Sequence, residues 1–159
     1  MKVRVLFVCL GNICRSPTAE VIVRERLVRA GLDQAVELDS AGTGSWHIGK
    51  APDARAQRAG AERGYSMEEL RARQVEPGDF YRFDYVLAMD EANLAELEMM
   101  RPEDARADVR RFLDFHPQAE ARDVPDPYYG GEQGFAHVLD LVEGAADGLI
   151  AHMRERHGL

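Results

Sequence analysis

Residues 3–17 read Val3-Arg4-Val5-Leu6-Phe7-Val8-Cys9-Leu10-Gly11-Asn12-Ile13-Cys14-Arg15-Ser16-Pro17. The first six residues favour β structure and are almost continuously apolar, which is typical of a strand covered on both faces. The next eight, from Cys9 to Ser16, are expected to form a loop, because Gly11 and Asn12 both tolerate positive φ. The stretch therefore predicts a buried strand followed at once by a tight loop.

A helix is expected to follow that loop. Ser16 is a preferred N-cap residue, and Pro17 would then occupy the first helical position. The apolar stripe of this helix continues to about Ala30, and Gly31 is a typical helix terminator.

The alternation of strand and helix continues along the chain. Further strands are expected over residues 36–41, 83–89 and 109–115. Further helices are expected over residues 52–64, 90–100 and 134–157, with a long irregular segment over 116–132. Ser66 and Glu69 have the spacing of a capping box, which predicts one more short helical turn.

This alternation predicts the fold class. Strands separated by helices pair in parallel, with helices on both faces of the sheet. We expect an α/β fold in which residues 1–159 form a single domain, a three-layer sandwich with a four-stranded parallel sheet, flavodoxin-like or Rossmann-like. Ligands of such sheets bind beyond the carboxyl ends of the strands, where the loop at 9–16 would lie.

Composition limits the classes of function. The chain has 159 residues, of which 45% are hydrophobic and 30% are charged, and its net charge is −8. A net acidic protein is a poor candidate for binding nucleic acid or an anionic membrane. No secretory signal or membrane span is visible, so we expect a cytoplasmic protein. The sequence leaves the oligomeric state open, and a monomer is our expectation. The scattered histidines and two cysteines do not have the spacing of a metal site.

The loop itself carries the chemistry. Cys9 and Arg15 are separated by five residues, between a strand and a helix N-terminus. That helix end and a nest of loop N–H groups attract anions, and a fork of Arg15 donors matches two oxygens of a tetrahedral oxyanion. The same positive field would favour a Cys9 thiolate, which is a nucleophile. The expected phosphate-binding residues are Leu10, Gly11, Asn12, Ile13, Cys14 and Arg15.

With its Gly-Asn and Arg-Ser-Pro extensions, this C-x5-R loop resembles that of the low-molecular-weight protein tyrosine phosphatases. The resemblance covers most of the chain and includes Ser40-Ala41-Gly42-Thr43, Arg73-Gln74, Met89-Asp90 and Val124-Pro125-Asp126-Pro127-Tyr128-Tyr129-Gly130-Gly131. It implies hydrolysis of phosphotyrosine, in a protein or in a small aryl phosphate, through a phosphocysteine at Cys9 with release of inorganic phosphate. It implies no metal or organic cofactor, because the sulfur and Arg15 take the place of a metal.

The resemblance also assigns roles outside the nucleophile. Asp126 matches the general acid that later acts as base, with Asp123 in reserve, although a residue between two prolines is also a common turn residue. Ser16 would donate to the sulfur in addition to capping the helix. Asn12 is expected at positive φ, tied to Ser40. Cys14 would be a redox partner of Cys9, or would simply pack beneath the loop.

The substrate pocket is expected to be aromatic. The resemblance places Trp46 and His47 at one wall and Tyr128 and Tyr129 opposite, although the sole tryptophan could instead be a core residue. Ile13 stands where relatives that act on phosphoarginine carry a small hydroxyl residue, so its bulk favours the tyrosine-type pocket.

One position departs from the resemblance. Many relatives have a histidine before Arg-Ala-Arg-Gln that joins the Asp of the Met-Asp pair behind the loop, whereas here Leu70 stands there. Asp90 must therefore find other partners, such as Ser16, Ser40, the surroundings of Arg15 or backbone N–H groups.

Two other functions remain open on the same scaffold. One is arsenate reduction, which needs a relay of thiols that a chain with only two cysteines is poorly equipped to supply. The other is a non-catalytic module that binds phosphate.

Overall fold

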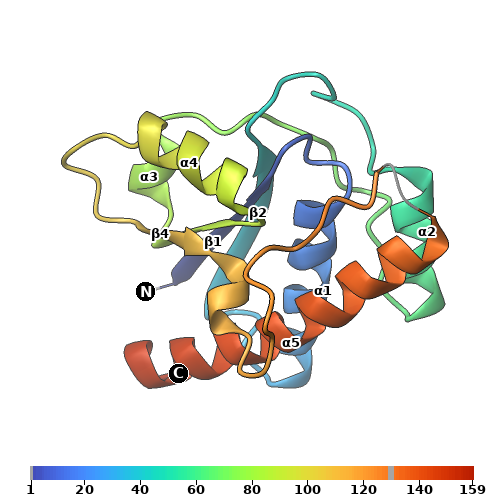
Figure 1. Cartoon of the computed structure of the whole chain (residues 1–159). Coiled ribbons are helices and arrows are strands. Elements are labelled where there is room, and N and C mark those ends of the chain that lie inside the picture. The colour runs from blue at the N-terminus through green and yellow to red at the C-terminus, as the bar shows by residue number, and fades with distance from the viewer. Residues whose placement is uncertain (1, 129–130) are drawn as a thin grey trace.

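The computed structural model describes residues 2–128 and 131–159, and strand and helix alternate along them (Figure 1). In chain order the elements are β1 (Val3–Cys9), α1 (Arg15–Arg29), β2 (Val36–Gly42), α2 (Ala54–Glu62), α3 (Asp79–Arg82), β3 (Tyr85–Ala88), α4 (Glu91–Met100), β4 (Asp108–Arg111), the 3-10 helix η1 (Phe112–Phe115) and α5 (Glu132–His157).

The sheet has four strands in the order β2-β1-β3-β4, and every neighbouring pair is parallel. This confirms the predicted α/β class and the parallel sheet. Because β1 is central, the loop that follows it opens at the middle of the carboxyl edge, with Cys9 opposite Gly42 of β2.

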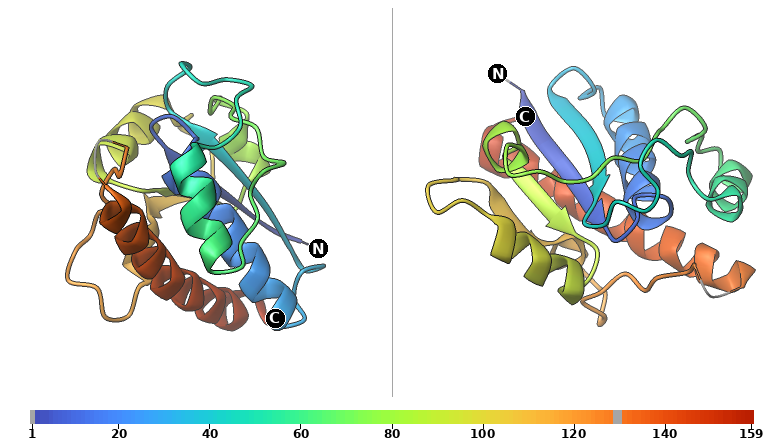
Figure 2. Two further views of the ribbon diagram at one scale, coloured as in Figure 1. Left: turned by 90° about the vertical axis from the view of Figure 1, so that its right-hand side faces the viewer. Right: turned by 90° about the horizontal axis from the view of Figure 1, so that it is seen from above.

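Helices cover both faces of the sheet, as Figure 2 shows. Val5, Phe7 and Cys9 of β1 belong to the core cluster that contains the buried residues of α1 and α5. Leu6 and Val8, which alternate with them, belong to a second cluster, which includes residues of α3 and α4. A strand that buries both sides must be apolar at successive positions, and this explains the continuous run at the start of the sequence.

The fourth strand is shorter than the sequence predicts. It ends at Arg111, and the apolar residues after it form η1 instead of the strand expected to reach Phe115. Phe112 and Leu113 are adjacent and both belong to the core cluster beside α5. A strand would point neighbouring side chains to opposite faces, whereas a helical turn allows both to reach the same one.

The prediction at Ser66 and Glu69 is right about the short turn but not about a helix. Residues 68 and 69 form a turn, which the Leu70 N–H closes by donating to the Met67 carbonyl over 3.2 Å. Residues 66–70 contain no helix, and Ser66 is exposed between the buried residues Tyr65 and Met67. The short helix α3 was not predicted, whereas the expected bounds of β2, β3, α2 and α5 lie within two residues of those observed.

Among the helices of residues 2–128 and 131–159, none has both the length and the apolar character needed to cross a bilayer.

Candidate active site

The loop between β1 and α1 places Cys9 at the carboxyl end of a central strand. Its side chain is buried, and its sulfur lies 3.0 Å from the hydroxyl oxygen of Ser16. The backbone N–H of Asn12 donates to the same sulfur over 3.3 Å. The sulfur is therefore held from two sides, by the loop and by the first turn of α1.

Ser16 does not cap the helix, contrary to the prediction. Helix α1 begins at Arg15, with Cys14 at the N-cap and no side-chain capping bond. The Ser16 hydroxyl is occupied instead by the Cys9 sulfur and by the amide nitrogen of Asn12, which donates to it over 2.8 Å. The N–H groups of a first helical turn have no partner within the helix, so this uncapped end suits an anion.

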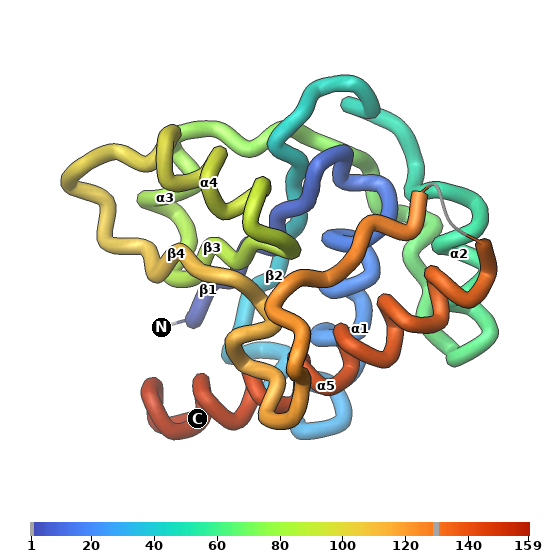
Figure 3. Tube along the Cα trace, in the orientation of Figure 1, coloured from blue at the N-terminus to red at the C-terminus, as the bar shows by residue number. Residues whose placement is uncertain are grey.

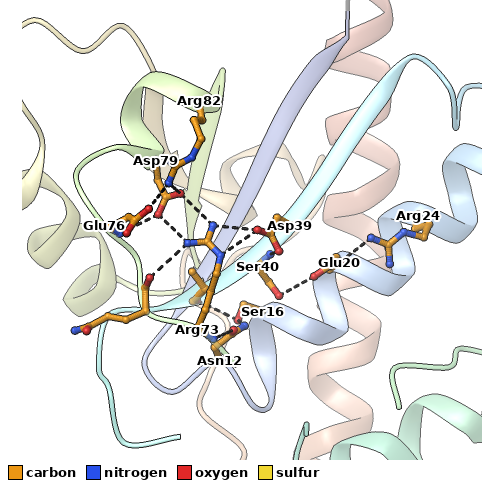
Figure 4. Close-up of polar contacts among 12 residues, drawn as sticks. Asn12, Ser16, Glu20, Arg24, Asp39, Ser40, Arg73, Glu76, Asp79 and Arg82 are labelled. Carbon is orange, nitrogen blue, oxygen red and sulfur yellow. Dashed lines mark hydrogen bonds and ion pairs between the residues drawn. The ribbon is translucent and has the colours of Figure 1, made fainter. Parts of the chain in front are cut away.

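Asn12 adopts a φ of 57°, which confirms the expected positive φ. Its predicted tie to Ser40 is wrong. The Asn12 side chain binds Ser16 and accepts the backbone N–H of Arg73 over 3.0 Å. Ser40 donates over 2.7 Å to the buried carboxylate of Glu20, because β2 presents Ser40 to helix α1 (Figure 4).

Arg15 is buried, with 3% of its side chain exposed, and one of its three guanidinium nitrogens already donates twice within the protein. Its Nη1 donates to Asp90 over 2.6 Å and to the carbonyl of Val124 over 2.9 Å. A guanidinium has five N–H donors, so Nε and Nη2 remain as a fork for two oxygens of an anion. Burial opposes the charged form of Arg15, but Cys9, Asp90 and Asp126 outweigh it and the net pKa of Arg15 is raised.

Asp90 binds other groups in place of the histidine that this chain lacks. One oxygen accepts from Arg15, and the other accepts from the backbone N–H of Asn93 over 2.8 Å and so caps α4. Leu70, at the histidine position, packs against the core cluster around β1 and α5. The prediction that Asp90 would turn to the surroundings of Arg15 and to a backbone N–H agrees with these contacts.

Asp126 reaches the loop from a segment more than a hundred residues away, which Figure 3 shows passing the β1–α1 loop. One of its oxygens lies 3.6 Å from Nη2 of Arg15, and the other accepts the backbone N–H of Tyr128 over 3.0 Å. Asp126 thus also makes a turn contact, as the alternative interpretation expected. Asp123 binds Arg111 over 3.2 Å and is not among the residues lining the cavity described next.

A cavity of about 380 Å³ lies at this loop. Every residue that lines it had been singled out from the sequence: Cys9, Leu10, Gly11, Ile13, Cys14, Arg15, Trp46, His47, Asp126 and Tyr128. Trp46 is 68% exposed, so it is a wall of the cavity and not a core residue. Its ring lies over Gly44, where an added Cβ would come within 1.9 Å of it. Tyr129 lies outside the described residues.

Two supporting residues had no predicted role. Arg55 stacks on the Tyr128 ring at 5.2 Å and forks onto Asp53. Arg73 supplies the N–H that holds Asn12. The sequence offered one hint for each, namely the short Asp53-Ala54-Arg55 spacing and the Arg73-Gln74 pair of the resemblance.

Cys14 is also buried, and both cysteines are free thiols. Burial raises the pKa of Cys14 far above its ordinary value, and the charges of Asp53, Cys9 and Asp126 raise it further. A redox pairing of Cys14 with Cys9 stays a prediction. Among residues 2–128 and 131–159, no three His, Cys, Asp or Glu side chains are grouped so as to hold a metal.

Known proteins resemble this chain in sequence and in fold. A sequence profile of the family described as low molecular weight phosphotyrosine protein phosphatase matches residues 4–158. A low molecular weight protein-tyrosine-phosphatase of Streptomyces coelicolor is 46% identical over 159 residues, which cover 98% of this chain and 96% of the relative. A crystal structure of a protein tyrosine phosphatase from Entamoeba histolytica has a TM-score of 0.93 at 41% identity and covers 99% of this chain and 100% of that one. YfkJ from Bacillus subtilis has a TM-score of 0.92 at 39% identity, covering 98% and 97% of the two chains.

Fold and loop together thus define a phosphatase. More narrowly, the chain belongs to the low molecular weight phosphotyrosine protein phosphatase family, as the resemblance predicted. It is a protein-tyrosine-phosphatase, and its substrates are phosphorylated molecules.

Proposed function

We propose that this phosphatase hydrolyses phosphotyrosine and small aryl phosphate monoesters through a covalent phosphocysteine at Cys9. The observation that carries the proposal is one shared cavity. Cys9, the buried Arg15 and Asp126 all line it, and an Asp126 oxygen lies 3.6 Å from Nη2 of Arg15. A nucleophile, a fixed positive charge and a proton donor are the three groups that the reaction needs.

In the first step the sulfur attacks phosphorus while the bond from phosphorus to the aryl oxygen breaks. Nε and Nη2 of Arg15 hold two phosphate oxygens, and the N-terminal N–H groups of α1 hold others. Asp126 transfers its proton to the departing oxygen. The transition state of phosphoryl transfer is loose, so positioning and neutralisation of charge contribute most of the acceleration.

In the second step the Asp126 carboxylate takes a proton from water as its oxygen bonds to phosphorus and the sulfur–phosphorus bond breaks. Inorganic phosphate leaves and the thiolate is restored. The Ser16 hydroxyl, 3.0 Å from the sulfur, donates to it as negative charge returns.

The cavity walls favour an aryl ester. Trp46 and Tyr128 are aromatic and Ile13 is bulky and apolar, so a phenyl ring gains contacts that a serine ester cannot make. His47 also borders the cavity, beside Gly11. We expect the enzyme to work as a monomer in the cytoplasm, without a cofactor and without nucleic-acid or membrane partners.

A substrate panel tests the proposal. Purified protein is offered p-nitrophenyl phosphate and matched peptides carrying phosphotyrosine, phosphoserine or phosphoarginine, and separately arsenate with a thiol reductant. We expect release of phosphate from the first two, with kcat/KM for the phosphotyrosine peptide at least about 100-fold above that for phosphoserine, the scale set by a lost aromatic contact and poor placement. Arsenate reduction without ester hydrolysis would establish the reductase, and phosphate binding without any turnover would establish the binding module.

A further inference from the structure

Asn12 combines an unusual backbone conformation with several hydrogen bonds around the Cys9 sulfur. It is the one non-glycine residue with positive φ in the described part of the chain. Its backbone N–H donates to the Cys9 sulfur, and its side-chain nitrogen donates to Ser16, which contacts the same sulfur. Asn12 therefore supplies one of the two groups that contact the sulfur and is hydrogen-bonded to the other.

The third bond of Asn12 leads away from the loop. Its side-chain oxygen accepts the backbone N–H of Arg73 over 3.0 Å. Arg73 belongs to a segment without regular helix or strand that meets the end of β2 through a single parallel bridge between Gly42 and Gln74. At Gly42 an added Cβ would lie 2.8 Å from the Leu10 carbonyl, so loop and strand end are already in close contact there.

The Arg73 side chain is fixed at the other side by two carboxylates (Figure 4). Nη1 and Nη2 donate to the two oxygens of Asp79 over 3.0 and 3.1 Å, and Nε donates to Asp39 over 3.0 Å. A forked guanidinium–carboxylate pair fixes orientation as well as distance. The backbone of Arg73 is thereby anchored to α3 and to β2 at once.

Asp79 is well suited to be the fixed point. It is completely buried, and it also accepts the backbone N–H of Glu76 over 2.9 Å and Nη2 of Arg82 over 2.8 Å. Burial raises the pKa of Asp79, but the hydrogen bonds from Arg73, Glu76 and Arg82 outweigh it and the net pKa is lowered. The carboxylate is thus ionised in the folded protein and all its partners are cations or N–H groups.

We propose that Arg73, held by Asp79 and Asp39, is a positioning residue for the Cys9 sulfur, acting through Asn12. The proposal rests on the proposed function, since it takes Cys9 as the nucleophile. Arg73 itself touches neither the sulfur nor the cavity lining. Its effect is to keep the Asn12 N–H and the Ser16 hydroxyl aimed at the sulfur.

A double-mutant cycle tests the route through Asn12. The four proteins are the wild type, Asp79→Asn, Asn12→Gly and the double variant. Glycine accepts positive φ without strain, so Asn12→Gly removes the acceptor of the Arg73 N–H and leaves the backbone conformation accessible. Asp79→Asn should lower kcat for p-nitrophenyl phosphate about 10-fold when Asn12 is present, a loss typical of a slightly misplaced catalytic group. In Asn12→Gly, where the route from Arg73 is already cut, the same substitution should lower kcat less than about 2-fold. KM should change less than kcat.

A matched control separates positioning from general stability. Glu143 of α5 joins Arg63 over 2.6 Å and the Tyr65 hydroxyl over 2.7 Å, in a comparable cluster that does not border the cavity. Glu143→Gln should lower the melting temperature while kcat stays within about 2-fold. If Asp79→Asn does not fold, Asp39→Asn replaces it, because the Asp39 side chain is 45% exposed.

The outcomes are distinct. Asp79→Asn could lower kcat by the same factor in the wild type and in Asn12→Gly, or could leave kcat unchanged. Either result would overturn the positioning role and leave Arg73 a structural residue. The rate at which iodoacetate alkylates Cys9 gives a second readout, which should fall with the same non-additive pattern. If the wild type hydrolyses no ester, the proposed function fails, and the alkylation cycle still decides whether Arg73 positions the sulfur.

Discussion

The two ends of the loop carry the same functional group in different surroundings. Cys9 and Cys14 are five positions apart, and both are buried, with 2% and 5% of their surface exposed. The Cys9 sulfur contacts an N–H and a hydroxyl and lies beside Arg15 in the cavity. Cys14 lies near the carboxylates of Asp53 and Asp126, which together with burial raise the pKa of its thiol and so favour the protonated form.

Burial therefore does not distinguish the two thiols. Cys9 ends a strand, where the Asn12 N–H donates to its sulfur, and Cys14 begins a helix, where its carbonyl accepts the backbone N–H and the hydroxyl of Thr18. The nearest charges do distinguish them, and for that reason we expect Cys9, as proposed, and not the protonated Cys14 to be the nucleophile.

The largest expected effect comes from exchanging the two cysteines for serine separately. Cys9→Ser should lower kcat for p-nitrophenyl phosphate by about 10⁴-fold or more, because a hydroxyl in this position is a far weaker nucleophile. Cys14→Ser should stay within about 5-fold of the wild type. Phosphate binding measured by calorimetry serves as the control, since Cys9→Ser should retain it. Comparable losses in the two variants would remove the distinction between the thiols.

A smaller effect is expected at Asp126, whose carboxylate also raises the pKa of Cys14. Asp126→Ala should lower kcat about 100-fold with phenyl phosphate, whose leaving group has a pKa near 10, because that oxygen needs a proton to depart. With p-nitrophenyl phosphate, a better leaving group, the loss should be clearly smaller. Asp123→Ala is the matched control and should leave both rates nearly unchanged. Equal losses with the two esters would exclude Asp126 as the general acid.

The smallest effect concerns the pH dependence of stability. The raised pKa of Cys14 means that the folded chain keeps a proton that the unfolded chain loses above about pH 8.5. The contribution of Cys14 is fully present below that pH and declines above it, by at most about 1.4 kcal/mol per pH unit.

This prediction is measured by urea unfolding at about pH 7.5 and about pH 9.5, on either side of the ordinary thiol pKa. Comparing Cys9→Ser with Cys9→Ser/Cys14→Ala leaves Cys14 as the only thiol that differs. The free energy of unfolding should fall more steeply with pH when Cys14 is present. Parallel pH curves would show that Cys14 ionises as easily in the folded protein as in the unfolded one.

The sequence alone was sufficient to predict features that depend on a repeating pattern or on residues close together in the chain. The apolar run at residues 3–8 predicted a doubly covered strand, and the helix expected over residues 90–100 is observed as α4 (Glu91–Met100). The position of Asp126 beside the loop was reached only through the resemblance, because no local pattern links residues so far apart. The structure does place it 3.6 Å from Arg15.

The partner that each polar side chain binds was the feature least predictable from the sequence. Ser16 is a good N-cap residue by type, yet its hydroxyl contacts the Cys9 sulfur and accepts from the Asn12 amide, and the helix starts two residues earlier than expected. Ser40 lies on β2 near the loop, but Glu20 of α1 takes its hydroxyl. Which of several reachable partners wins depends on positions differing by about an ångström, a scale that hydrogen-bond geometry resolves and sequence spacing does not.

The exposed position of Trp46 has a practical consequence. It is the chain's only tryptophan, and it stands at the cavity mouth with 68% of its surface in solvent. The molecule thus contains a single indole, and it lies at the place where a ligand would arrive. We expect emission from that one indole to change when the cavity is occupied, with no label to attach and no second indole to subtract.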